Sequence, residues 1–193
     1  LLCQQKDPET LLRAARLAAE LRPDTRFVVV GDGPLRPQVE RLLDELELRD
    51  HVTLLGRRSD VDALLPGFDA FVLSSRWEGL PRVVVEAMAV GVPVVSTDVG
   101  GIAEAVEDQV SGLLVPPGDS VSLANALVRA FGEPGLGARL RATAATRVDE
   151  FDIGAMTDSL DDLYSGLLAG SRNRPRRRRT ATAVRTAAGH EAA

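Results

Sequence analysis

The sequence predicts an α/β fold built around one doubly wound parallel sheet. Short β-branched runs alternate with helix-like segments between residues 7 and 115, which is typical of consecutive βαβ units. Glycine-rich segments directly follow several of these runs, and the carboxyl ends of the strands are where such sheets bind ligands. The 193 residues, of which 45% are apolar, suffice for one domain with a buried core.

The elements follow one another in a regular order. Asp7 and Pro8 suit the N-cap and the first position of a helix over residues 7–22. The strand-like runs are residues 26–30, 51–56, 70–73, 92–96 and the start of segment 111–119. The other predicted helices are residues 34–48, 60–68, 83–91, 102–108, 120–131, 136–151 and 153–170. In the last two of these regions, we expect Phe151, Leu160 and Leu163 to leave an apolar face partly uncovered, so that the isolated chain self-associates.

Charge divides the chain into a body, residues 1–170, and a tail, residues 171–193. The body holds 16 basic and 27 acidic residues, whereas the tail holds seven arginines and one glutamate. An acidic body argues against nucleic acid as the main partner. The tail has almost no large apolar residue, so we expect it to be disordered. Its arginines can contact anionic lipid or nucleic acid, but we favour a solvated tail without a specific role.

The apolar runs, the N-terminus and the cysteine content indicate the location of the protein and limit its possible disulfide and metal sites. No run approaches the ~18 apolar residues of a membrane span, and no basic-then-apolar signal opens the sequence. We therefore expect a cytoplasmic protein, with peripheral membrane contact through the tail as the alternative. Because Leu1 lies inside what resembles a βα unit, we expect a preceding domain to be missing. Cys3 is the single cysteine, which excludes an internal disulfide and a multi-cysteine metal site.

A glycine turn follows the strand at residues 26–30. Gly31 and Gly33 occupy the place of a dinucleotide fingerprint, but position 36 is Arg and no acidic residue ends the next strand. Two interpretations remain equally open. The turn brings backbone N–H groups near a phosphate, or it only connects a strand to a helix.

Two acids flank the start of the helix at residues 83–91. Glu86 stands among valines, alanines and a methionine, so this helix has almost no polar face and a solvent-facing role fits poorly. Its carboxylate can accept two hydrogen bonds from a vicinal diol. Glu78 precedes the helix in a loop, and the N–H groups of Gly79 and Leu80 favour an anion there. Pro81 suits the first turn.

Other side chains carry weaker signals. The loop at residues 97–101, which contains Asp98, comes at the same sheet edge and either lines the pocket or is an ordinary connection. Trp77 is more consistent with a packing wedge than with a stacking platform. His51 and His190 have no metal-ligand partner at useful spacing, so no metal site is expected. Paired acids also serve glycoside hydrolysis, but nothing here indicates a carboxyl group that is kept protonated.

At these residues the sequence resembles the retaining glycosyltransferases of family 4, the group 1 glycosyl transferases, in their C-terminal nucleotide-sugar domain. The matching motif runs from Glu78-Gly79-Leu80-Pro81 through Glu86 to the G-V-P-V-V strand at residues 91–95. The segments at residues 31–34, 97–101 and 112–115 match further family motifs in order and spacing. The resemblance covers residues 1–168.

The resemblance implies a fold and roles for particular residues. The fold would be a Rossmann-like domain, the donor-binding half of a GT-B type enzyme. Glu86 would bind the ribose hydroxyls, Glu78 a hydroxyl of the transferred sugar, and Lys6, the only lysine in the chain, the diphosphate. Gly79 and Leu80 would approach the sugar and diphosphate. The strand end at residues 52–56, with Gly56, would lie by the base.

The reaction implied is transfer of a sugar from a nucleoside-diphosphate donor to an acceptor hydroxyl with retention, without a metal or another cofactor. Two departures from the family pattern limit this chain. The family's Gly-Arg pair is lacking before Lys6, and the domain that supplies the acceptor site and a catalytic histidine is not in the sequence. We therefore expect this chain alone to be inactive. The alternatives are a non-catalytic nucleotide-sugar-binding module and a related sugar phosphorylase or epimerase. The donor sugar, nucleobase and acceptor are not evident from the residues.

Overall fold

The computed structural model describes residues 1–151 and 153–172. Its contacts divide the chain into two compact units, Leu1–Asp152 and Ile153–Ala193. The last helix ends at Arg172, two residues beyond the predicted body. The rest of the Arg-rich tail, for which disorder was predicted, lies outside the described residues.

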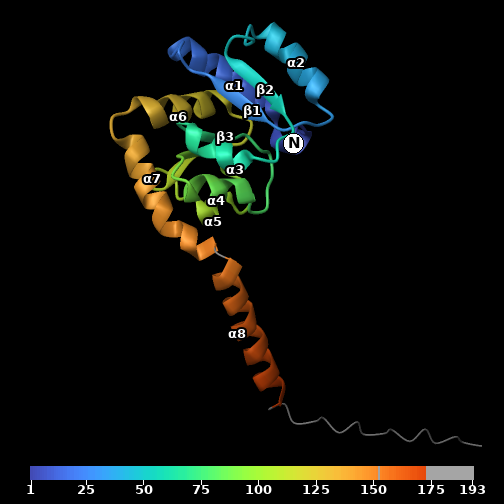
Figure 1. Ribbon diagram of the computed structural model, residues 1–193, viewed down its shortest axis with the longest axis vertical. Helices are drawn as coiled ribbons and strands as arrows, with labels where there is room; N and C mark the ends of the chain where they lie inside the picture. The colour runs from blue at the N-terminus through green and yellow to red at the C-terminus, as the bar shows by residue number, and fades with distance from the viewer. Residues whose placement is uncertain (152, 173–193) are drawn as a thin grey trace, which may run out of the picture. The chain divides into compact units, whose positions relative to one another are not determined.

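The first unit alternates strands and helices in the predicted order (Figure 1). Its strands are β1 (Phe27–Val30), β2 (Val52–Gly56), β3 (Phe71–Leu73), β4 (Val94–Thr97) and β5 (Gly112–Val115). Its α-helices are α1 (Pro8–Leu21), α2 (Arg36–Glu45), α3 (Val61–Leu64), α4 (Arg82–Ala89), α5 (Ile102–Ala105), α6 (Ser120–Gly132) and α7 (Leu136–Arg147). Three 3-10 helices are η1 (Gln4–Lys6), η2 (Leu65–Gly67) and η3 (Val148–Phe151). The predicted α/β class with parallel strands is confirmed.

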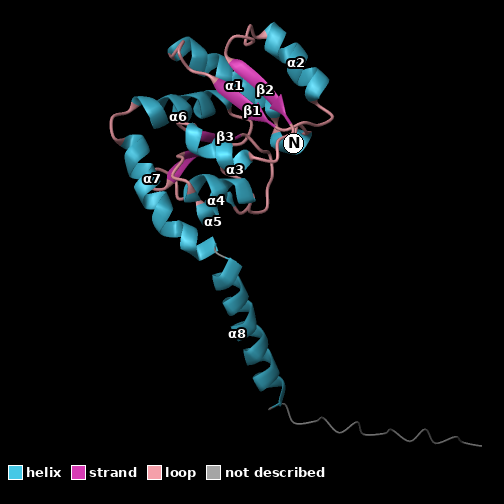
Figure 2. Cartoon of the chain, viewed as in Figure 1, coloured by secondary structure: helices cyan, strands magenta, loops and turns pink. Residues whose placement is uncertain are grey.

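The strands form two parallel sheets instead of the single sheet that was predicted (Figure 2). β1 pairs with β2, and β3, β4 and β5 pair in that order. Every pair is parallel, as the helical crossovers require. β4, between two neighbours, is buried along its whole length, whereas all three residues of β3 are only half-buried. Alternation of elements predicts parallel pairing but not which strands become neighbours, so the division into two sheets was not foreseen.

The N-terminal segment connects the carboxyl ends of the two sheets. After β1, the N–H of Leu2 donates to the carbonyl of Asp32 (3.0 Å), and the carbonyl of Leu2 accepts from the N–H of Leu35 (3.1 Å). After β3, the hydroxyl of Ser74 donates to the carbonyls of Lys6 (2.8 Å) and Asp7 (3.0 Å). Residues 2–7 therefore bring the loops that follow β1 and β3 to one segment.

Two apolar cores hold the first unit together. In the larger core, α1 packs against α6, with Leu12 and Ala15 of α1 and Leu123 of α6 almost inaccessible to solvent. In the smaller core, Val84 and Met88 of α4 lie beside β4 and α5. Truncating a buried leucine or methionine of either core to alanine costs about 2–5 kcal/mol, so both cores stabilise the first unit.

The second unit is represented by α8 (Ile153–Arg172). Its large apolar side chains are exposed, with Leu160 and Leu163 among them, as the sequence predicted. Phe151 differs from that prediction, because it packs against the smaller core of the first unit.

Candidate functional site

The predicted lysine and acid form an ion pair at the carboxyl end of β3. Lys6 ends η1, Glu78 lies in the loop before α4, and the Lys6 ammonium contacts Oε1 of Glu78. The Glu78 side chain is only 6% exposed and the Lys6 side chain 27%. A carboxylate this well buried needs several donors to offset its lost hydration.

Glu78 obtains those donors from residues that the sequence did not single out. The hydroxyl of Ser75 donates to Oε1 over 2.6 Å, and the amide Nε2 of Gln5 donates to Oε2 over 3.2 Å. The same Gln5 nitrogen also contacts the carbonyl of Trp77 at 3.1 Å. Both carboxylate oxygens are therefore held, and the direction of the acid is fixed by its neighbours.

A second ion pair joins the same two segments. Nε of Arg76 donates to Oδ2 of Asp7 over 2.8 Å, and the N–H of Arg76 donates to the carbonyl of Gln5, also over 2.8 Å. Asp7 adopts a left-handed backbone (φ 45°) and caps α1, because its carboxylate accepts from the N–H and hydroxyl of Thr10. That conformation is unfavourable for a non-glycine residue. The hydrogen bonds of Asp7 hold it in place, and with it the corner that carries Lys6.

The loop after β4 holds the Glu78 loop from another side. The hydroxyl of Thr97 donates to the carbonyl of Ser75 over 2.6 Å, and the N–H of Gly101 donates to the carbonyl of Gly79 over 3.0 Å. Gly100 has φ +56°, and a Cβ there would lie 1.8 Å from the carbonyl oxygen of Glu78. Only glycine meets both requirements. The loop at residues 97–101 thus supports the acid through the backbone.

Glu86 differs from the expectation of an apolar helix without a polar face. Its side chain is 46% exposed and makes a 3.4 Å ion pair with Arg82 one turn earlier. α4 buries Val84, Ala87 and Met88 and turns Glu86 away from that core. The apolar run misled because three buried positions suffice for a short helix. Among the described residues, no hydrogen bond links Glu86 to the Lys6–Glu78 pair.

Two smaller expectations about the Glu78 loop are also corrected. Pro81 is the N-cap residue of α4 and not a first-turn residue. Trp77 is 55% exposed and therefore does not act as a packing wedge. Neither position was distinguishable from its neighbours by sequence spacing alone, because both depend on how the loop turns into α4.

The glycine turn after β1 is closely packed by the chain itself. A Cβ on Gly33 would lie 2.4 Å from the carbonyl oxygen of Leu2. The N–H of Gly31 donates to the carbonyl of Gly56 (2.8 Å), and the N–H of Gly33 donates to Oδ1 of Asp32 (2.8 Å). Both N–H groups are thus occupied by protein acceptors. The structure gives the turn a connecting role, and its contact with a donor stays a prediction.

The two remaining predicted residues lie in loops and are exposed to solvent. Leu80 is exposed, and Asp98 is exposed while its N–H donates to the carbonyl of Val115 (2.8 Å). The structure therefore brings together Lys6, Glu78 and the loop at residues 97–101, whereas Glu86 lies on α4 and the glycine turn follows β1.

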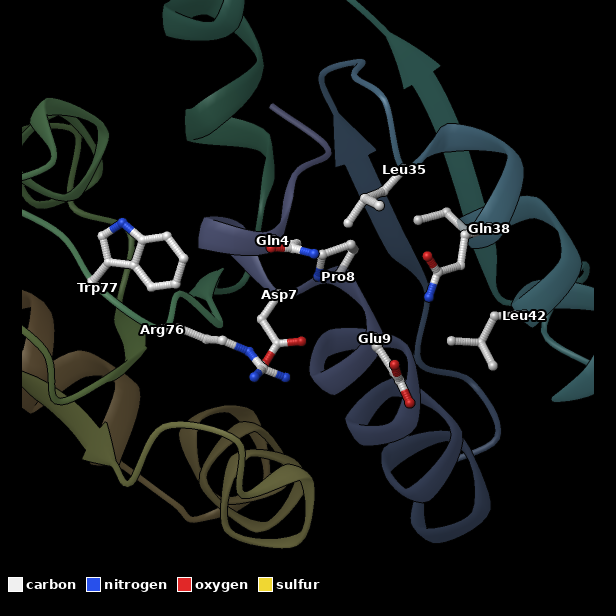
Figure 3. A pocket seen from close by; sticks show the side chains of 10 residues that line it. Gln4, Asp7, Pro8, Glu9, Leu35, Gln38, Leu42, Arg76 and Trp77 are labelled. Atoms are coloured by element: carbon white, nitrogen blue, oxygen red, sulfur yellow. The ribbon is translucent and has the colours of Figure 1, made fainter.

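A cavity of about 310 Å³ opens at the Asp7–Arg76 ion pair and Trp77 (Figure 3). One wall is formed by Arg76 and Trp77, and the other by α1 and α2 residues. Its lining residues are Gln4, Asp7, Pro8, Glu9, Leu35, Gln38, Val39, Leu42, Arg76 and Trp77. Lys6 and Glu78 are not among them, so we place the candidate site by its charged groups and not by this hollow.

Residues 1–151 and 153–172 contain no group of three or more His, Cys, Asp or Glu side chains suited to hold a metal ion. Within the same ranges, no helix is both long and apolar enough to span a bilayer.

Related sequences point to one class of protein. The chain is 34% identical over 166 residues to the Escherichia coli UDP-Gal:alpha-D-GlcNAc-diphosphoundecaprenol alpha-1,3-galactosyltransferase, covering 84% of this chain and 43% of the relative. It is 32% identical over 166 residues to the alpha-D-kanosaminyltransferase of Streptomyces kanamyceticus, with the same shares of 84% and 43%. The chain thus spans less than half the length of these relatives.

Solved structures agree with this class. The Anabaena protein Alr3699/HepE, solved in complex with UDP-glucose, matches with a TM-score of 0.78 and 30% identity, covering 86% of this chain and 46% of that one. Staphylococcus aureus TarM matches in fold with a TM-score of 0.78 at 20% identity, covering 84% of this chain and 33% of that one. The family model described as "Glycosyl transferases group 1" matches residues 2–147. The chain therefore belongs to the group 1 glycosyl transferases.

Proposed function

We propose that this chain carries the donor site of a retaining glycosyltransferase, which transfers a sugar from a nucleoside-diphosphate sugar to an acceptor hydroxyl. The observation that carries the proposal is the Lys6–Glu78 pair, a cation and a buried acid held together at the carboxyl ends of the strands. A nucleotide sugar presents the complementary groups, since its diphosphate is anionic and its sugar hydroxyls donate hydrogen bonds.

Lys6 is proposed to neutralise the diphosphate. Its ammonium is partly exposed and sits on a corner fixed by Asp7 and Ser74. The start of α4, an eight-residue helix, adds the N–H groups of the residues after Pro81, whose dipoles favour an anion. As the bond to the sugar breaks, negative charge grows on the leaving diphosphate. A fixed cation and fixed N–H groups stabilise that charge without reorganising.

Glu78 is proposed to bind a hydroxyl of the sugar. A carboxylate offers about four acceptor positions, and Lys6, Ser75 and Gln5 occupy three of them. One position thus remains for a sugar hydroxyl, and arrival of the diphosphate releases a second one by drawing Lys6 away. Holding the sugar in one orientation is the protein's main contribution to a transfer in which the leaving group itself takes up the acceptor proton.

Glu86 is proposed to bind the ribose. Its exposure and its long contact with Arg82 leave the carboxylate free to exchange Arg82 for two hydroxyls of a diol. The base would lie near Gly56 at the end of β2. The HepE structure with UDP-glucose makes uridine nucleotides the first donors to try. We further propose that the sugar is transferred to a hydroxyl oxygen of an acceptor that is bound outside this chain. We also propose that the reaction takes place in the cytoplasm and needs no metal or other cofactor.

The proposal is tested by calorimetric titration of this chain with paired nucleoside diphosphates and nucleotide sugars. Glu86→Ala is expected to weaken the nucleoside diphosphate and its sugar alike, by roughly tenfold, as loss of hydrogen bonds to a charged group predicts. Glu133→Ala is the matched control, because Arg129–Glu133 has the same i,i+4 arrangement at 3.3 Å on α6. Unchanged affinity in Glu86→Ala would remove that residue from the site.

A further inference from the structure

Two adjacent serines after β3 contact opposite members of the ion pair. The Ser74 hydroxyl donates to the carbonyls of Lys6 and Asp7 at 2.8 and 3.0 Å. The Ser75 hydroxyl donates to Oε1 of Glu78 at 2.6 Å. The dipeptide thus fixes the segment that carries the cation with one side chain and the acid with the next.

Ser75 is itself held firmly. It is fully buried, and its carbonyl accepts from the hydroxyl of Thr97, another fully buried side chain, over 2.6 Å. Neither the backbone nor the hydroxyl of Ser75 can turn without breaking one of these bonds. A short hydrogen bond from a fixed hydroxyl to a carboxylate is among the stronger kinds, so Ser75 directs Glu78 more tightly than the 3.2 Å contact from Gln5 does.

Under the proposed function, the hydrogen bond from Ser75 to Glu78 matters most when the diphosphate binds. Without donor, Oε1 of Glu78 accepts from both Lys6 and Ser75. A bound diphosphate competes for the Lys6 ammonium, because two phosphate groups carry more charge than one carboxylate. Once Lys6 turns to the diphosphate, two of the donors that contact Glu78 in the described structure remain. They are Ser75 and Gln5.

We infer that Ser75 is a positioning residue for sugar recognition: it keeps Glu78 aimed at the sugar after Lys6 has moved to the diphosphate. The inference rests on the proposed function and adds that the two serines have separate tasks. Ser75 serves the sugar, whereas Ser74, through the Lys6 carbonyl, serves the diphosphate. A residue of merely structural importance would affect both parts of the donor equally.

The inference is tested by measuring how much the sugar adds to the affinity of the nucleoside diphosphate. Calorimetry on this chain gives the dissociation constants of UDP, GDP and dTDP and of UDP-glucose, UDP-galactose, GDP-mannose and dTDP-glucose. For the pair that binds, the ratio of the diphosphate constant to the nucleotide-sugar constant measures the sugar contribution. In Ser75→Ala we expect this ratio to fall by about tenfold with the diphosphate constant nearly unchanged.

Two variants serve as controls. Ser122→Ala removes a serine–carboxylate bond of the same 2.6 Å length, to Asp119 at the start of α6, and should leave the ratio unaltered. Ser74→Ala should weaken the diphosphate itself and leave the ratio near its wild-type value. If Ser75→Ala does not fold, Ser75→Cys takes its place, because a thiol is only a weak donor and fills the buried position that the hydroxyl occupies.

The outcomes separate the two ideas. An unchanged ratio in Ser75→Ala, or an equal loss for the diphosphate and the nucleotide sugar, overturns the positioning role while the donor site stands. If the folded wild-type chain binds none of these nucleotides, the proposed function fails and the inference fails with it. A wild-type ratio of one also overturns the inference, since Glu78 would then read no sugar.

Discussion

Replacing Gly100 with alanine should damage the Glu78 loop far more than the backbone angle alone explains. Two terms add at this position. The left-handed backbone at φ +56° costs a non-glycine residue about 1–2 kcal/mol. In addition, the new Cβ would lie 1.8 Å from the carbonyl oxygen of Glu78, whereas ordinary contacts begin at about 3.4 Å, so one loop must move by more than an ångström.

The second term can be estimated from what such a movement breaks. It separates the N–H of Gly101 from the carbonyl of Gly79, now at 3.0 Å, a loss of about 1 kcal/mol. Overpacking of the loop adds about 1–3 kcal/mol. Gly100→Ala is therefore expected to lower the free energy of unfolding by about 3–6 kcal/mol in total, and to weaken nucleotide-sugar binding.

Gly118→Ala separates the two terms. Gly118 has φ +77°, and a Cβ there meets nothing within 4 Å, so only the backbone cost remains. Urea unfolding of both variants gives the difference, which should be about 2–4 kcal/mol. Equal losses in the two variants would mean that the loop at residues 97–101 does not press on Glu78, and the support described for the acid would be wrong.

Further predictions concern single charges and the last helix. Lys6 carries the only side-chain amine in the chain, so a bound nucleotide sugar should slow its acetylation, followed by mass spectrometry, whereas an unaltered rate would place the diphosphate elsewhere. Hydrogen bonds from Ser122 hold the pKa of Asp119 below its ordinary value. The stabilisation is thus present above the unfolded-state pKa and is lost as pH falls through the folded one, so wild type and Asp119→Ala should differ in Tm at pH 7 and converge in acid. Leu160→Glu should abolish self-association of the chain in light scattering, and a monomeric wild type would contradict this.

Much of the fold follows from local patterns in the sequence. Asp7 and Pro8 mark the start of α1, and the helices and strands appear in the predicted order, because helix caps and short β-branched runs are local signals. The division of the strands into two sheets is different. It depends on which strands become neighbours, and no local pattern encodes that choice.

The candidate site was likewise predictable from the sequence only in part. Lys6 and Glu78 could be singled out because a lone lysine and a loop acid stand out beside glycines and match a family motif. Gln5 and Ser75 could not, since 70 residues separate them and neither type is unusual in a loop. The solvent exposure of Glu86 was misjudged because the sequence shows which residues are apolar but not which three of them a short helix buries.

The central claim is that Lys6 holds the diphosphate while Glu78 reads the sugar. Titrating Lys6→Met and Glu78→Gln with one nucleoside diphosphate and its nucleotide sugar tests it most directly. We predict that Lys6→Met weakens both ligands by the same factor, about tenfold or more, whereas Glu78→Gln weakens only the nucleotide sugar. Equal effects of the two variants on both ligands, or no effect of either, would contradict the division of roles between the cation and the acid.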